Sequence, residues 1–196
     1  MNAAAVQTAP ATLEAFLAWE ERQPERFELV GGVVRLMAGG TEGHDRIGIN
    51  ILTALRTRLR GTPCSVHGSN LKVLSRSSNA SMYPDVFVRC GPRDDRRTTT
   101  EDPVVVFEVL SESTAKHDLT RKRLAYEEVP SLRRLIYVAT DEARLYVRVR
   151  GADGIWRDET VGGLDRALPL PELDLALPLA EIYEDTELAL EPAASG

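Results

Sequence analysis

The chain has 196 residues, of which 43% are hydrophobic and 28% charged, a composition that fits one folded domain of ordinary size. With only two cysteines, a disulfide framework is not expected, and a reduced cytoplasmic protein is the default. No apolar run approaches the ~20 residues that span a bilayer, and the first twelve residues lack the basic start and apolar centre of a signal peptide. Secretion and membrane insertion are therefore not expected.

In chain order, the first half predicts two helices with short strands between and after them. Thr12 is a suitable cap for the first helix, Gly31-Gly32 marks a hairpin turn, and Gly61 ends the second helix. The apolar residues of the second helix recur at helical spacing. The elements are, in order, a helix over 13–22, two strands within 26–37, a helix over 45–60 and strands over 63–74 and 82–89.

The second half predicts a central strand, one helix and a series of hairpin strands. A β-branched run is typical of a buried central strand, and the helix after it ends near Pro130. The elements are a strand over 103–110, a helix over 115–129, strands over 134–140, 143–150 and 154–161, and a leucine-rich edge segment over 167–185 that ends in a short helix. This order predicts a mixed α/β (α+β) fold with helices packed on a mixed sheet. We expect a single domain over 12–185, with flexible ends at 1–11 and 186–196.

The formal net charge of −6 conceals an uneven distribution of charge. Residues 158–196 hold ten acidic side chains and one basic one, whereas residues 1–157 hold 20 acidic and 23 basic ones. The main body is therefore mildly basic, which permits contact with phosphate groups without requiring it. The candidates for such contacts are the arginines within 56–60 and within the loop 89–97.

Glu108 is a carboxylate inside the apolar strand 103–110. By strand alternation it shares a sheet face with Val104, Val106 and Leu110. Burying an ionised carboxylate without a partner costs several kcal/mol, so Glu108 is expected either to meet an arginine from a neighbouring element or to serve a function. Asp85 has the same character, because it follows a proline at the start of a predicted strand and fits either a turn or a site.

Asp118, Lys122 and Tyr126 recur every four residues on the helix that follows the Glu108 strand, so they lie on one helical face. That face can be turned toward the C-terminal end of the strand. Carboxylates that hold Mg²⁺ and a lysine that orients water are what metal-dependent hydrolysis of a phosphodiester requires. The structural alternative is an ordinary Asp–Lys helix pair worth about 0.3–0.5 kcal/mol.

Several segments in this order resemble the Uma2 family, also called DUF820, whose members are described as restriction endonucleases. They are PDVFV at 84–88, FEVLSEST at 107–114 and the spacing of Asp118, Lys122 and Tyr126. FELVGGVVRLM, the glycine-containing loop before His44, the hairpin RLIYVAT…RLYVRV and the acidic leucine-rich ending are also similar. The resemblance covers the chain from about residue 12 to residue 185. It implies the PD-(D/E)xK nuclease fold, a mixed central sheet flanked by helices with a Mg²⁺ or Mn²⁺ site at its edge.

The resemblance also implies roles for individual residues. Asp85 and Glu108 match the metal-binding carboxylates of the superfamily, and Glu28 is a candidate third metal ligand. The superfamily usually places its lysine two residues after the glutamate, but that position here is Leu110. The resemblance therefore points to Lys122 as the residue that positions or deprotonates the attacking water. Support of the site or contact with the substrate is expected from His44, Asp118 and Tyr126.

The leading prediction is a metal-dependent endonuclease that acts on nucleic acid, DNA above all. The alternative is a nuclease-fold binding or assembly module that does not cut, and a third reading is a purely structural Glu108 paired with a core arginine. A homodimer is expected if both strands are cut, because two active sites are then related by a two-fold axis.

Overall fold

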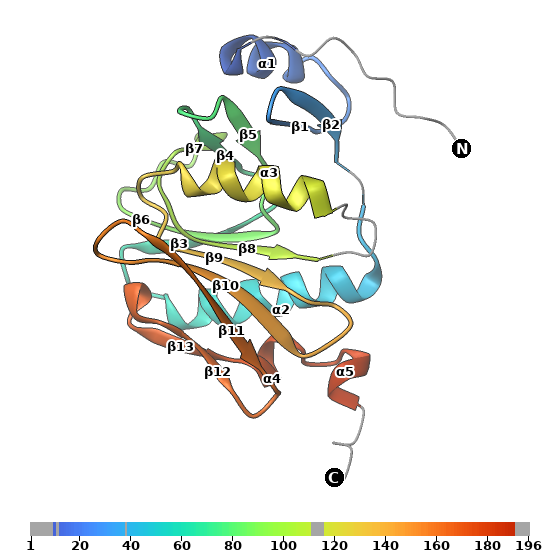
Figure 1. Ribbon diagram of the computed structural model, residues 1–196, viewed down its shortest axis with the longest axis vertical. Helices are drawn as coiled ribbons and strands as arrows, with labels where there is room; N and C mark the ends of the chain where they lie inside the picture. The colour runs from blue at the N-terminus through green and yellow to red at the C-terminus, as the bar shows by residue number, and fades with distance from the viewer. Residues whose placement is uncertain (1–9, 11, 38, 111–115, 191–196) are drawn as a thin grey trace.

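A six-stranded mixed sheet lies at the centre of the computed structural model, which describes residues 10, 12–37, 39–110 and 116–190, without the side chains of 116–119 and 190 (Figure 1). The parallel pair β8–β9 lies in its middle, and all other neighbours are antiparallel. Its strand order is β11 (Trp156–Gly162), β10 (Arg144–Arg150), β9 (Arg134–Val138), β8 (Pro103–Val109), β6 (Val86–Cys90) and β3 (Cys64–Gly68).

The helix α2 (Glu42–Arg58) covers one face of this sheet. The Thr41 hydroxyl caps it by accepting a hydrogen bond from the His44 backbone N–H at 3.3 Å. The apolar stripe predicted from the sequence is buried against β6, β8 and β9, which confirms the helix; it consists of Ile47, Ile51, Leu55 and Leu59. Capping by Thr41 places His44 in the first turn, at the edge of the sheet.

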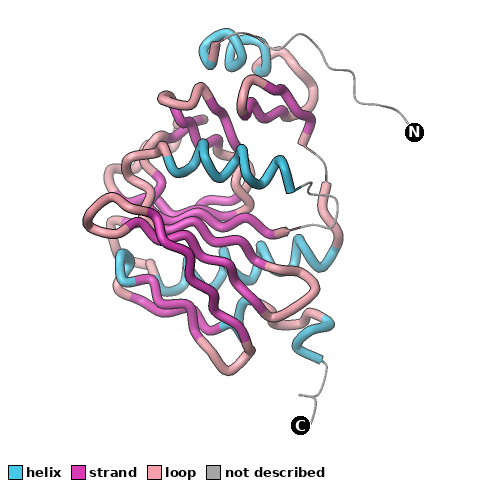
Figure 2. The backbone as a smooth tube through the Cα atoms, in the orientation of Figure 1, coloured by secondary structure: helices cyan, strands magenta, loops and turns pink. Residues whose placement is uncertain are grey.

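The helix α3 (Lys116–Glu127) covers the opposite face and connects the parallel strands β8 and β9. Its residues Ala125 and Tyr126 pack on Phe87 and Val106 of the sheet. Figures 1 and 2 show α3 above the sheet and α2 below it. A mixed sheet with a helix on each face is the predicted fold class, which is thereby confirmed. No helix in the described part of the chain is both long and apolar enough to cross a membrane.

A second, five-stranded sheet packs above α3 with the N-terminal helix α1 (Leu13–Glu20) (Figure 1). Its strand order is β2 (Val33–Leu36), β1 (Phe27–Val30), β5 (Ala80–Met82), β4 (Lys72–Ser75) and β7 (Thr99–Thr100). The predicted hairpin is confirmed as β1–β2. Its turn residues Gly31 and Gly32 have φ values of 57° and 75°, a conformation that favours glycine.

Two strands predicted as continuous are each divided between the two sheets. The predicted strand 63–74 consists of β3 in the six-stranded sheet and β4 in the five-stranded one, and the predicted strand 82–89 is divided in the same way between β5 and β6. In the second case the division falls at Pro84, which has no N–H to donate to a ladder. Asp85 therefore lies where the chain passes from one sheet to the other.

The C-terminal segment folds back as a hairpin instead of a single edge segment. The strands β12 (Ala167–Leu170) and β13 (Leu175–Pro178) flank the short 3₁₀ helix η1 (Pro171–Leu173) and bury their leucines on the α2 side of the central sheet. The predicted short helix follows as α4 (Leu179–Ile182), and α5 (Glu187–Leu190) comes after it.

Cys64 and Cys90 are joined by a disulfide, so the expectation of reduced cysteines is wrong for this structure. The two residues are direct partners in the antiparallel register of β3 and β6. The bond therefore joins the edge strand to its neighbour.

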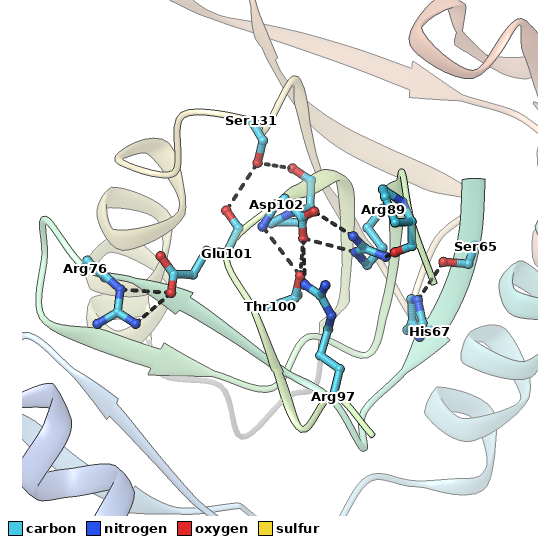
Figure 3. A network of polar contacts seen from close by, with 11 residues as sticks. Ser65, His67, Arg76, Arg89, Arg97, Thr100, Glu101, Asp102 and Ser131 are labelled. Atoms are coloured by element: carbon cyan, nitrogen blue, oxygen red, sulfur yellow. Dashed lines mark hydrogen bonds and ion pairs between the residues drawn. The ribbon is translucent and has the colours of Figure 1, made fainter. Parts of the chain in front are cut away.

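The loop between β6 and β8 is fixed by an ion pair between Arg89 and Asp102 (Figure 3). The Arg89 side chain is buried and donates to both carboxylate oxygens of Asp102, at 3.0 and 2.7 Å, and to the Pro92 carbonyl at 2.9 Å. The Thr100 hydroxyl also donates to Asp102, and Arg97 lies 3.7 Å from it. The Arg89 guanidinium holds the pKa of Asp102 at about 2, below its ordinary value.

This depressed pKa predicts acid-dependent stability. The ion pair with Arg89 stabilises the fold at pH values above the unfolded-state pKa of the Asp102 carboxyl. That contribution is lost as the pH falls from about 4 to about 2. Because the Asp102 side chain is 43% exposed, screening reduces the contribution to about 1 kcal/mol. We expect Asp102→Asn to lower the free energy of unfolding by about this amount at neutral pH, in urea titrations, with the difference shrinking below pH ~4. The exposed Asp95→Asn is the control, and a pH-independent difference for Asp102→Asn would contradict the assignment.

Candidate active site

Glu108 lies near the end of β8 and faces α3. Its Oε1 accepts a hydrogen bond from the Tyr126 hydroxyl at 2.6 Å, and the Lys122 Nζ lies 2.9 Å from Oε1 and 3.0 Å from Oε2. The Glu108 side chain is only 10% exposed, and Tyr126 is fully buried. Within the described residues, its charged partner is thus a lysine from the next helix and not the arginine of the structural alternative.

Lys122 connects two carboxylates that are distant in sequence. Its Nζ lies 3.0 Å from Glu28 Oε1, as well as contacting Glu108. Burial alone would lower the pKa of Lys122, but the negative charges of Glu108 and Glu28 raise it overall, so the ammonium stays charged. Burial raises the pKa of the Glu108 carboxyl, and the Lys122 charge opposes this shift. Lys122 and Tyr126 thus lie on one face of α3, as their spacing predicts, whereas the side chain of Asp118 lies outside the described residues.

Glu28 projects from β1 and is held by a backbone group. Its Oε1 accepts a hydrogen bond from the Tyr83 N–H at 2.7 Å. The Tyr83 hydroxyl in turn donates to Glu20 Oε1 at 2.8 Å, and Lys72 pairs with the same carboxylate. Tyr83 is therefore fixed both at its backbone and at its side chain. Sequence analysis missed Tyr83, because a backbone donor leaves no signature in the residue type; its only signal is its place before Pro84-Asp85.

Asp85 and His44 form the other half of the site. Asp85 Oδ2 accepts a hydrogen bond from the Val109 N–H at 2.7 Å, and His44 Nε2 lies 3.5 Å from the same oxygen. The hydrogen bond with Asp85 raises the pKa of His44, although burial lowers it. Since Val109 directly follows Glu108, this bond brings together the two residues predicted to bind metal: Asp85 directly precedes β6, and Glu108 lies near the end of the adjoining strand β8. The negative charge of Asp85 adds to the rise in the pKa of Glu108.

The donors can be compared with what a divalent cation requires. Mg²⁺ is commonly held by one or two carboxylates and keeps several waters, so Asp85 and Glu108 fit it as a pair. In the part of the chain that the structure describes, no three His, Cys, Asp or Glu side chains converge as a group that could hold a metal. Glu28 faces Glu108 across the Lys122 ammonium, which takes the position of a cation between them.

A small cavity opens beside Glu28 and Lys122. Val30 and Val33 of the β1–β2 hairpin form its apolar wall, and its two other lining residues are Arg35 and Arg121. Arg35 is the cross-strand partner of Glu28, and the stem of Arg121 packs over Gly31. The cavity therefore brings positive charge to the open side of the site.

The chain is similar in sequence to a known family and to two known proteins. The model of the Uma2 family, described as "Putative restriction endonuclease", matches residues 13–180. "Uncharacterized protein slr1290" of Synechocystis is 32% identical over 171 residues, which cover 87% of this chain and 90% of that protein. "Uncharacterized protein sll1609" of the same organism is 26% identical over 130 residues, covering 65% of this chain and 73% of that one.

A solved structure has the same fold. The crystal structure of "a putative nuclease belonging to DUF820" from Anabaena variabilis superposes with a TM-score of 0.72 at 18% identity. The superposition covers 89% of this chain and 98% of that chain. Together with the family match over residues 13–180, this confirms the resemblance inferred from the motifs: the chain belongs to the Uma2 family.

Proposed function

We propose that this protein is a metal-dependent endonuclease that hydrolyses phosphodiester bonds in nucleic acid, with DNA as the expected substrate. The observation that supports this most directly is the buried Glu108, which pairs with Lys122 and lies near Asp85 where β8 ends and β6 begins. A buried carboxylate, a lysine from the facing helix and a second carboxylate on the neighbouring strand are the parts that this reaction needs. Membership of a family described as "Putative restriction endonuclease" supports the same reaction class.

The roles follow from the contacts of each side chain. Asp85 and Glu108 would hold Mg²⁺ or Mn²⁺, with Glu28 as a third candidate ligand, and the bound ion would neutralise phosphate charge and acidify a water. Lys122 would orient the attacking water or a phosphate oxygen through its ammonium charge, because its three N–H donors are matched by three contacts with carboxylate oxygens of Glu28 and Glu108. Tyr126 fixes the Glu108 carboxylate, and His44 fixes Asp85. Asp118 stays a proposed supporting residue.

A direct test is incubation of the purified protein with supercoiled, linear and branched DNA and with RNA, each with Mg²⁺, Mn²⁺ or EDTA. We expect cleavage in the presence of the metal ion and none in EDTA, because the carboxylates alone cannot neutralise a phosphate. Cleavage that persists in EDTA, or no cleavage of any substrate with either metal, would refute the proposal.

A binding or assembly module that does not cut is the second candidate. The observation in its favour is the Lys122 ammonium, which already pairs with both Glu28 and Glu108 within the described structure. Such a module would bind nucleic acid equally in Mg²⁺ and in EDTA and leave it intact. For the endonuclease we further propose a cytoplasmic location and a homodimer, the latter because cutting two strands calls for two sites related by a two-fold axis.

A further inference from the structure

A second basic feature lies at the opposite end of α2 from the candidate active site. We propose that the groove formed there by the end of α2, the strand β3 and the segment after β6 binds the phosphodiester backbone of a nucleic acid. It would thus be a docking site remote from the cleavage site. The identity of the ligand as nucleic acid rests on the proposed function, whereas the existence of an anion site rests on the contacts described below.

The charged side chains that line the groove are all basic. Arg56 and Arg60 come from the end of α2 and the turn after it, and Arg93 comes from the loop after β6. The hydroxyl residues Thr62 and Ser65 also line it, and none of the described residues that line it is acidic. Guanidinium groups and hydroxyls together are the donors that proteins use to hold phosphate oxygens.

The neighbouring arginines have carboxylate partners, and these three do not, within the part of the chain that the structure describes. Arg58 is held by Glu181 at 2.6 and 2.8 Å, and Arg89 and Arg97 are both directed at Asp102 (Figure 3). Within the described residues, the three arginines of the groove have no carboxylate partner. A helix C-terminus favours basic residues and could account for Arg56 and Arg60. It does not account for Arg93, which reaches the same groove from a different segment.

Two independent measures give the separation of the groove from the candidate active site. Along α2, His44 and Arg56 are twelve residues apart, which corresponds to about 18 Å at the helical rise. Along β6, Asp85 and Gly91 are six residues apart, which corresponds to about 20 Å at the rise of a strand. Phosphates of one strand are about 3.4 Å apart along the axis of B-DNA, so the separation matches roughly five to six nucleotides. The disulfide joins β3, which lines the groove, to the last residue of β6, after which the segment with Gly91 and Arg93 begins.

The test measures binding in EDTA, where no cleavage is needed. Fluorescence anisotropy with a labelled duplex of about 20 base pairs would compare the wild type with Arg56→Gln/Arg60→Gln/Arg93→Gln over a range of salt concentrations. The matched control is Arg22→Gln/Arg133→Gln/Arg166→Gln, which removes the same number of charges from exposed arginines elsewhere. We expect the groove variant to bind about tenfold more weakly or worse, with a salt dependence lower by about 2–3 units of slope. The control variant should stay within about twofold of the wild type.

Equal losses in the two variants would overturn the inference, because net charge and not the groove would then drive binding. Calorimetric titration with inorganic phosphate tests whether the groove instead binds free phosphate. Saturable phosphate binding that only the groove variant loses, with unchanged duplex binding, would mean a site for free phosphate and would also overturn it. Loss of duplex binding in the groove variant of a protein that does not cleave with any metal would refute the proposed function and leave this inference standing. Metal-dependent cleavage by the wild type, together with duplex binding that is unchanged in the groove variant, would support the proposed function and refute this inference.

Discussion

Glu108→Gln is expected to lower metal-dependent cleavage by at least about 100-fold, the scale found when a residue that holds or orients a metal is lost. Glutamine has the shape of glutamate and can still accept the Tyr126 hydroxyl, so the variant removes the charge and keeps the packing. The measurement is the turnover rate on the DNA substrate that the wild type cuts best, at saturating Mg²⁺ and Mn²⁺. Glu128→Gln, the same chemical change at an exposed position of the segment that follows α3, serves as the control.

The fold of the Glu108 variant is checked separately by thermal unfolding. If Glu108→Gln unfolds cooperatively and still cleaves at more than about a tenth of the wild-type rate, the carboxylate is not part of the reaction centre. If both it and the control lose activity together, the loss does not depend on the site. A selective loss assigns the reaction class and its location at once.

The half of the candidate site that follows local periodicity could be predicted from the sequence. Strand alternation gives the face of Glu108, and helical spacing gives the common face of Lys122 and Tyr126. The strand and the helix are consecutive, so their facing side chains meet without any knowledge of the rest of the fold. The start of α2 is predicted less well, because the predicted helix begins at residue 45, whereas the cap at Thr41 starts it at Glu42 and includes His44 in the first turn.

What could not be predicted depends on contacts between distant segments. The Tyr83 N–H that holds Glu28 is a backbone group freed by the break before Pro84, and its partner is 55 residues away. The disulfide depends on the register between β3 and β6, which the isolated pattern of either strand does not specify. The same is true of the groove arginines, because local sequence does not show that Glu181 and Asp102 pair with Arg58 and Arg89 and not with the arginines of the groove.

Lys122→Met is expected to lower the free energy of unfolding by about 3 kcal/mol or more, because removing one partner of a buried ion pair leaves the other uncompensated. Here the residue removed serves two carboxylates, Glu28 and Glu108, whose side chains are 19% and 10% exposed. Methionine keeps the length and packing of the side chain, so the loss reports the charge. The measurement is urea unfolding of the wild type and the variant in EDTA.

The same experiment with Mg²⁺ tests whether the ammonium takes the position of a cation between the carboxylates. We expect Mg²⁺ to raise the stability of Lys122→Met more than that of the wild type, because the ammonium then no longer takes the position of the cation. A ligand that binds the folded state more tightly stabilises it more. The double variant Glu108→Gln/Lys122→Met should recover part of the loss, and the double-mutant cycle then gives the coupling energy of the pair. A loss of unfolding free energy below about 1 kcal/mol for Lys122→Met would mean that the ion pairs of Lys122 contribute no more than exposed ones. An equal Mg²⁺ effect on both proteins would place the metal away from Lys122, at Asp85 alone.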